Sequence, residues 1–221
     1  PASIAKTIEG ILQLDPDRLT CYSYARQADT FRHQRAIQAP SLPSLADRLI
    51  MFNSIVDAME SSGYVWVGLD SFVRPGDPVA AAQDNRCLQH NWMGYHSHGS
   101  DQLLGFGASA ISEVAGACVQ NHAAIDDWAA AIDRGLLPVR AGVQLTESGQ
   151  RHRTAVSGLL SNMELSAAMV PAEGQPAWQE LHDQGYLLMD GDRVSITEQG
   201  RYLLHHICGN SVLDQRWSSG W

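Results

Sequence analysis

The chain contains only four cysteines, and none lies close enough to another to form a recognised metal-binding motif. Cys87 and Cys118 are the nearest pair, 31 residues apart. Neither a C-x-x-C pair nor a C-x-x-x-C-x-x-C loop is present, so the spacing predicts no zinc site and no iron–sulfur site. Four scattered cysteines in 221 residues are typical of reduced thiols, and they indicate a cytoplasmic protein rather than a disulfide framework.

Long hydrophobic segments and an excess of basic residues are absent too. No apolar run approaches the roughly 20 residues of a membrane span, and the opening PASIAKTIEG lacks the basic start and apolar core of a signal peptide. The 15 Lys and Arg residues are outnumbered by 24 Asp and Glu residues, which gives a net charge of −9 and a pI of about 5.3. We therefore expect no membrane partner and no nucleic-acid partner.

The first third of the chain has the pattern of helices that alternate with strands. Ser44-x-x-Asp47 has the form of a capping box, apolar residues follow at helical spacing, and Gly63 supplies the stop. The apolar run 64–69 begins at once and is typical of a buried parallel strand. The alternation predicts an α/β fold, and it includes an earlier helix at residues 3–14 and a strand at residues 18–24.

The last third has the outline of a small winged-helix-like domain. It contains predicted helices at residues 154–169 and 178–184, a hairpin at 186–196, and a final helix that Thr197 caps and that runs to His206. From residue 150 onward, five Lys and Arg residues stand against eight Asp and Glu residues, a net charge of −3. Because a DNA-binding version should be basic, we interpret residues 136–221 as a structural cap on a first domain at residues 1–135.

Residues 86–112 combine His, aromatic and Gly residues in a mixture that core packing does not usually require. Such a segment is typical of a surface that holds a flat or polar ligand close to the backbone, although a solvated irregular loop has a similar composition. Within it, Gly105 to Ala110 fit the pattern G-x-G-x-x-A, but no acidic residue closes a second strand as a dinucleotide site requires. We expect a close-packed turn beside another ligand, followed by a helix from Gly107.

Two histidine-containing groups and one carboxylate remain as candidates for chemistry. His90, His96 and His98 have the residue type of metal ligands, but a loop H-x-H is a weak signal, and we predict no metal site in this chain. Asp70 follows the strand at residues 64–69, a position where ligand-facing residues collect and where a carboxylate can also simply cap a loop. The cluster at residues 151–153, Arg-His-Arg, either binds an anion or pairs with nearby carboxylates.

Several segments in the same order resemble the oxygen-independent coproporphyrinogen III oxidases, which are radical S-adenosylmethionine enzymes. The resemblance is strongest at residues 72–75 (FVRP), 90–95 (HNWMGY) and 103–112 (LLGFGASAIS). It also includes residues 14–19, 24–25, 34–35, 42–43, 63–64, 68–70, 120–121 and 145–147, together with Arg153 and Asn162. Each segment alone is unspecific, whereas the ordered set is fairly specific.

The resemblance implies that residues 1–135 are the later part of a partial TIM-like (β/α) barrel and that residues 136–221 are the family's helical C-terminal domain. The family's [4Fe–4S] cluster loop has no counterpart here, so the chain is expected to be the C-terminal part of such an enzyme and inactive alone. The whole enzyme uses S-adenosylmethionine and the cluster to decarboxylate two propionates of coproporphyrinogen III to vinyls. A tetrapyrrole and an electron donor are the implied partners, and a monomer is expected.

The resemblance also assigns cofactor-binding positions. Ala25 and Ile111 match positions that line the S-adenosylmethionine site, while Trp92 and Met93 match a Phe-Gln pair near the second S-adenosylmethionine and the substrate. Trp92 retains the capacity to stack, whereas Met93 lacks the amide group of Gln. The family's histidines after the Tyr-Ala pair and after the strand-end Asp are replaced by Arg26 and Ser71.

No residue of this chain is expected to be catalytic. The departures from the family pattern leave a second hypothesis open, in which the chain is a non-catalytic haem-binding protein or haem-chaperone-like paralogue. In that case His90, His96 and His98 would offer axial ligands to the iron.

Overall fold

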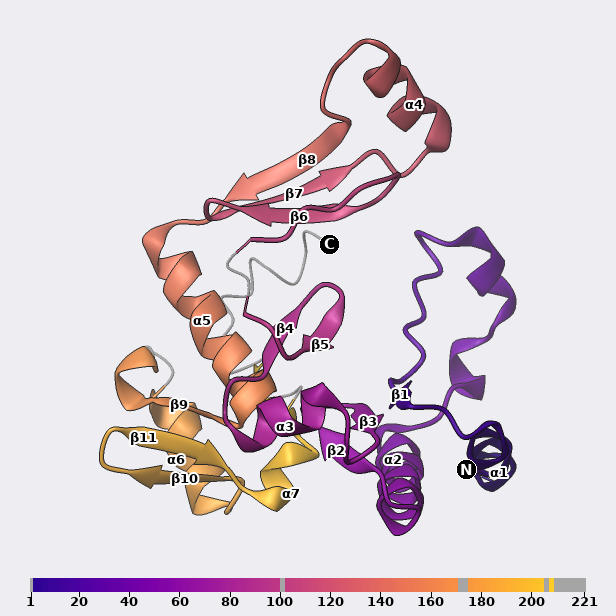
Figure 1. Ribbon diagram of the computed structural model, residues 1–221. Helices are drawn as coiled ribbons and strands as arrows, with labels where there is room; N and C mark the ends of the chain where they lie inside the picture. The colour runs from indigo at the N-terminus through magenta and orange to yellow at the C-terminus, as the bar shows by residue number, and fades with distance from the viewer. Residues whose placement is uncertain (1, 100–101, 171–174, 205–206, 209–221) are drawn as a thin grey trace. The chain divides into compact units, whose positions relative to one another are not determined.

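The computed structural model describes residues 2–99, 102–170, 175–204 and 207–208 (Figure 1). It contains helices and antiparallel sheets, which confirms the α/β class at that level. The contacts divide the chain into two compact units, Pro1–Arg86 and Cys87–Trp221. The sequence-based boundary between residues 135 and 136 stays a prediction.

The first unit is built on a three-stranded sheet in the order β1-β3-β2, formed by Arg18–Thr20, Ser71–Val73 and Val65–Val67. Both pairings are antiparallel, so the parallel pairing expected for residues 64–69 is wrong for this partner. The physical reason is the connection: only three residues separate β2 from β3, and a parallel crossover needs about a dozen or more. Gly68, with a φ of 55°, begins this tight turn.

The first unit also contains three α-helices: α1 (Ile4–Leu14), α2 (Leu45–Ser61) and α3 (Pro78–Asp84). Helices α2 and α3 contact β2, and α1 contacts α2. The predicted capping box of α2 is confirmed, because the Ser44 hydroxyl accepts from the Asp47 amide at 3.1 Å and the Asp47 carboxylate accepts from the Ser44 amide at 3.2 Å. Two 3₁₀ helices, η1 (Arg32–Ala36) and η2 (Ala39–Ser41), lie between β1 and α2.

The second unit begins with the hairpin β4 (Gln89–Asn91) and β5 (Gly94–His96) and continues with a sheet of β6 (Ile111–Val114), β7 (Ala117–Asn121) and β8 (Val139–Gln144). Figure 1 shows α4 (Ile125–Asp133) beyond the end of these three strands, between β7 and β8. The helix expected from Gly107 is wrong: the chain turns and enters β6. Ala115 and Gly116, with φ of 51° and 76°, form the two-residue turn into β7.

The rest of the second unit contains α5 (Glu147–Asn162), β9 (Glu164–Ser166), η3 (Ala167–Met169), α6 (Gln175–Asp183), β10 (Leu187–Asp190), β11 (Arg193–Ile196) and α7 (Glu198–Arg201). The predicted hairpin at residues 186–196 is confirmed as β10 and β11, and β9 completes the sheet. The helix predicted at 154–169 starts earlier and stops at Met163, whose φ is 58°. Thr197 caps α7 as predicted, and His205 and His206 lie outside the described residues.

The cores of the two units are apolar. Val67, Phe72 and Met59 are fully buried in the first unit, and Trp178 and Leu187 in the second. Within the described parts of the chain, no helix combines the length and hydropathy needed to cross a membrane.

Candidate functional site

The end of β1 and the start of β3 bring a thiol, a hydroxyl pair and a carboxylate together. The Cys21 amide donates to the Asp70 carbonyl at 2.8 Å, and the hydroxyls of Thr20 and Ser71 lie 3.2 Å apart. Burial and the negative charge of Asp70 raise the pKa of the Cys21 thiol to about 11. The thiol is therefore protonated near neutral pH. The carboxylate of Asp70 accepts from the Ser71 hydroxyl at 3.3 Å, and its ligand-facing role stays a prediction.

Ala25 lies in the exposed segment that follows β1. It opens a stretch of 13 residues, 25–37, whose two limbs are joined by hydrogen bonds between side chains and the backbone. We call residues 25–37 the arginine lobe. The sequence of residues 25–43 predicts irregular structure with a short helical turn near residues 32–37, and η1 (Arg32–Ala36) confirms that turn.

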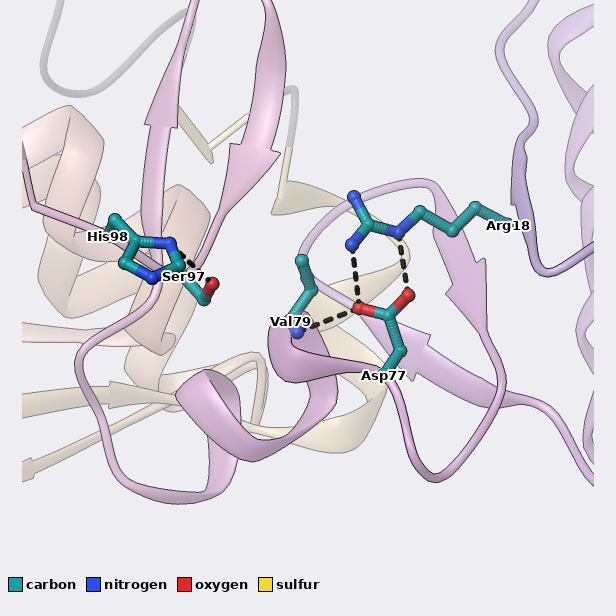
Figure 2. Close-up of polar contacts among 5 residues, drawn as sticks. All are labelled: Arg18, Asp77, Val79, Ser97 and His98. Carbon is teal, nitrogen blue, oxygen red and sulfur yellow. Dashed lines mark hydrogen bonds and ion pairs between the residues drawn. The ribbon is translucent and has the colours of Figure 1, made fainter.

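A two-point ion pair connects β1 to the start of α3 (Figure 2). Arg18 donates from Nε and Nη2 to the two carboxylate oxygens of Asp77 at 2.6 and 2.9 Å, and the amide of Val79 donates to the same carboxylate at 2.8 Å. Burial alone would raise the pKa of Asp77, but the hydrogen bonds from Arg18 and Val79 outweigh it and lower the pKa. The pair fixes the first turn of α3 and has the character of a structural contact.

In the second unit, Trp92 and Met93 form the tip of the β4–β5 hairpin. They are 51% and 83% exposed, and the Met93 amide donates to the side chain of Asn91 at 2.8 Å. The Trp92 indole also hydrogen-bonds the thiol of Cys118 on β7. Burial and the charge of Glu113 raise the pKa of this thiol, while Trp92 and Arg153 act in the opposite direction. The hairpin tip is thus held against the strand pair β6–β7.

Ile111 is the first residue of β6 and is half-buried. Its carbonyl lies so close to Gly105 that a Cβ built on this glycine would be 2.3 Å from the Ile111 oxygen. The Asn121 side chain closes the turn by donating to the Gly107 carbonyl at 2.8 Å, and the Gly105 amide donates to Ser112 Oγ at 3.0 Å. The close-packed turn is confirmed. A strand rather than a helix follows it, so the dinucleotide interpretation is wrong.

Two of the four predicted cofactor residues, Ile111 and Trp92, therefore lie at the same strand pair, β6–β7. Ile111 is the first residue of β6. Trp92 contacts Cys118 of β7, and Cys118 pairs with Glu113, two residues after Ile111 on β6. Met93 lies at the same hairpin tip as Trp92. Ala25 belongs to the first unit.

The three histidines near the hairpin do not converge. His90 pairs with Tyr95 across the hairpin, with ring centroids 4.7 Å apart, whereas His96 lies on the alternate face and contacts Asn91 at 3.0 Å. The other ring nitrogen of His96 is hydrogen-bonded to the carbonyl of His98 at 2.7 Å. The Ser97 hydroxyl lies 3.0 Å from Nδ1 of His98, and these two side chains are drawn in Figure 2. Among the described residues, no group of three His, Cys, Asp or Glu side chains has metal-binding geometry.

The basic cluster at residues 151–153 is engaged by carboxylates. Arg151 pairs with Glu147 one turn earlier in α5 at 2.7 Å, and Arg153 pairs with the buried Glu113 of β6. These pairs confirm the carboxylate alternative, and the Arg153–Glu113 pair attaches α5 to the sheet that carries Ile111.

Comparison with known proteins gives a consistent result. A curated oxygen-independent coproporphyrinogen III oxidase from Pseudomonas aeruginosa is 32% identical over 219 residues, which cover 94% of this chain and 48% of that protein. A relative of the same name from Thermostichus vulcanus is 29% identical and is covered to 66%. The chain is a homologue of the oxygen-independent coproporphyrinogen III oxidases. No protein-family model matches it.

A solved structure agrees with these sequence relatives. The coproporphyrinogen III oxidase from Escherichia coli, described as a radical SAM enzyme, aligns with a TM-score of 0.85 and 29% sequence identity over 94% of this chain and 50% of the other. The match fits the C-terminal part of the family, as expected. The chain spans about half the length of the Pseudomonas aeruginosa and Escherichia coli proteins.

Proposed function

We propose that this chain is the C-terminal part of an oxygen-independent coproporphyrinogen III oxidase. The reaction is the oxidative decarboxylation of two propionates of coproporphyrinogen III to vinyls, which forms protoporphyrinogen IX. The observation that carries this proposal is the similarity in sequence and fold over 94% of the chain. The tetrapyrrole is the substrate, an electron donor serves the cluster, and the protein works as a cytoplasmic monomer.

At the level of architecture, we propose that residues 1–135 contribute the later part of a partial (β/α) barrel. Residues 136–221 form its winged-helix-like cap. The order α5, α6, β10, β11, α7, with β9 beside β11, supports the cap. In the described part of the chain every strand pairing is antiparallel, so the parallel pairings of a barrel would require strands beyond these.

The residues of this chain do not fit a [4Fe–4S] cluster. A cluster is held by several cysteine thiolates that converge on it. Among the described residues, which include Cys21, Cys87, Cys118 and Cys208, no three His, Cys, Asp or Glu side chains form a metal-binding group. Burial also raises the pKa of the Cys21, Cys118 and Cys208 thiols and so favours their protonated form. The cluster of the proposed enzyme is therefore held by residues outside this chain.

The residues near Ile111 fit a bound S-adenosylmethionine better. Gly105 packs directly against the Ile111 backbone, which holds this turn in one shape, and the exposed Trp92 ring can stack on a flat group. When bound, the group supplies the radical that removes hydrogen from the propionates. The role proposed for Ile111, Trp92 and Met93 of the second unit is to contact and orient it, and the cofactor role of Ala25 in the first unit stays a prediction.

A chimera tests the proposed function directly. This chain would replace the matching half of the Pseudomonas aeruginosa enzyme, and the purified hybrid would be reconstituted without oxygen and given S-adenosylmethionine, reductant and coproporphyrinogen III. Protoporphyrinogen IX, detected by chromatography after oxidation to the porphyrin, is the expected product. A folded hybrid that carries its cluster but forms no product would refute the proposal, and the unmodified enzyme is the control.

The haem-binding alternative is not favoured by the structure. His90 and His96 lie on opposite faces of the same hairpin, so their side chains diverge and do not converge on one iron as a pair of axial ligands.

A further inference from the structure

The arginine lobe, residues 25–37, is a basic segment in an acidic chain. It contains Arg26, Arg32 and Arg35 and a single acidic residue, Asp29, whereas the whole chain has a net charge of −9. All four of these side chains belong to exposed residues. A local excess of guanidinium groups attracts anionic ligands, most strongly where carboxylates can be bound in a two-point manner.

Three hydrogen bonds hold the lobe in a defined shape. Arg26 donates from Nε to the Ile37 carbonyl at 2.9 Å, and Arg35 donates from Nε to the Ala28 carbonyl at 3.1 Å. Between them, the buried side chain of Gln34 accepts from the backbone amide of residue 27 at 2.5 Å. The ladder joins residues 26 to 37, 27 to 34 and 28 to 35, so it fixes Arg26 and Arg35 on one small body. Both arginines use Nε for the fold and keep their terminal nitrogens for other partners.

The lobe differs in this respect from other arginines of the chain. Within the described residues, none of its three guanidinium groups pairs with a carboxylate, and the side chain of Arg32 makes no hydrogen bond. At least five arginines elsewhere do form ion pairs, namely Arg18, Arg74, Arg151, Arg153 and Arg193. The lobe therefore concentrates positive charge that the rest of the described fold does not neutralise.

Exposed aromatic rings accompany this charge. Phe31 is 45% exposed and lies beside His33 with ring centroids 6.0 Å apart, and Tyr24 immediately before the lobe is 52% exposed. Rings and guanidinium groups together suit a ligand that has a flat body and several carboxylates. A simple phosphate would use the charge but not the rings.

We propose that the arginine lobe binds the propionate carboxylates of a tetrapyrrole, with Arg26, Arg32 and Arg35 as the anion-binding residues. The inference rests on the proposed function and deepens it by naming the residues that recognise the substrate. The lobe follows the end of β1, directly after the predicted cofactor position Ala25.

Binding of coproporphyrin III, the stable oxidised form with four carboxylates, to the full 221-residue chain tests the proposal. Porphyrin fluorescence reports the Kd. Arg32→Gln is the cleanest variant because this side chain makes no bond that shapes the lobe, and we expect Kd to rise about three- to five-fold. The double change Arg26→Gln/Arg35→Gln should raise Kd about ten-fold or more. Arg134→Gln, another exposed arginine whose Nε donates to a backbone carbonyl, is the matched control and should bind as the wild type does.

Changes of ligand give a test that involves no mutation. The tetramethyl ester of coproporphyrin, which has the same ring without charge, should bind at least ten-fold more weakly, and protoporphyrin IX with two carboxylates should fall between the two. Equal affinity for acid and ester, no binding by the wild type, or an equal loss in Arg134→Gln would overturn the inference.

The same arginine changes in the chimera separate this inference from the proposed function. If the chimera forms product and its KM is unchanged in Arg32→Gln and in the double variant, the proposed function holds and tetrapyrrole binding by the arginine lobe is refuted. If porphyrin binding depends on the arginines but the chimera forms no product, the binding role holds and the proposed function is refuted.

Discussion

Replacing Gly105 with Ala should destabilise the second unit and disturb the backbone around Ile111. A Cβ at this position would lie 2.3 Å from the Ile111 oxygen and 2.9 Å from its carbonyl carbon, both of them backbone atoms. Neither atom belongs to a flexible side chain, so the turn or the start of β6 must shift. The φ of Gly105 is not in the left-handed region, and the cost is therefore one of space alone.

The magnitude follows from two opposing effects. Overpacking of this kind costs about 1–3 kcal/mol, and a contact with backbone belongs at the upper end. In the opposite direction, Ala reduces the conformational entropy of the unfolded chain, which stabilises the folded state by about 0.4–1 kcal/mol. The net loss of unfolding free energy is about 2 kcal/mol, which corresponds to a fall in Tm of about 4–8 °C for a protein of this size.

Thermal and urea unfolding measure the effect, and Gly149→Ala is the matched control. Gly149 lies in the first turn of α5 in the same unit, and a Cβ there meets only ordinary contacts at 3.5 Å and beyond. The same chemical change should therefore stabilise α5 by about 0.5–1 kcal/mol. If Gly105→Ala were neutral or stabilising, like the control, the close approach of Gly105 to Ile111 would not exist in solution.

Three further outcomes are expected. Burial and the charge of His96 lower the pKa of His90 below its ordinary 6.5. The unfolded chain therefore binds a proton at this residue before the folded chain does, so the free energy of unfolding is highest above about pH 6.5 and decreases as the pH falls through the lower folded pKa. His90→Phe should reduce the pH dependence of the unfolding free energy measured in urea between pH 7.5 and 5.5. The same pH dependence in the variant and the wild type would contradict this. Iodoacetamide at pH 8 should modify the exposed Cys87 well before Cys21, with the extent of modification measured by mass spectrometry. In the same assay over a range of pH, Asp70→Asn should lower the pKa of Cys21, but not to 9.0, because burial is the larger cause of its shift. The purified chain alone, given coproporphyrinogen III, S-adenosylmethionine and reductant, should form no protoporphyrinogen IX, and any turnover would show that the cluster-binding half is not required.

Local patterns in the sequence were sufficient for elements whose signal is short-range. The capping box of Ser44 and Asp47, the hairpin at residues 186–196 and the cap of α7 at Thr197 each depend on residues within a few positions of one another. The close-packed turn at Gly105 was predictable for the same reason. The family resemblance, carried by ordered short motifs, agrees with the homologues found over 94% of the chain.

Sheet partners and charge partners were decided only in three dimensions. The apolar run 64–69 predicts a parallel strand, but its strand β2 is joined to β3 by only three residues, so the two strands pair antiparallel. The direction of the pairing depends on the length of this connection and not on the hydrophobicity of the strand. Nothing in the composition of the segment shows that Gln34 joins the two limbs of the arginine lobe, or that Trp92 reaches Cys118. Residue type and local period are written in the sequence itself, whereas contacts between distant residues form only when the whole chain has packed, and the tertiary structure alone decides them.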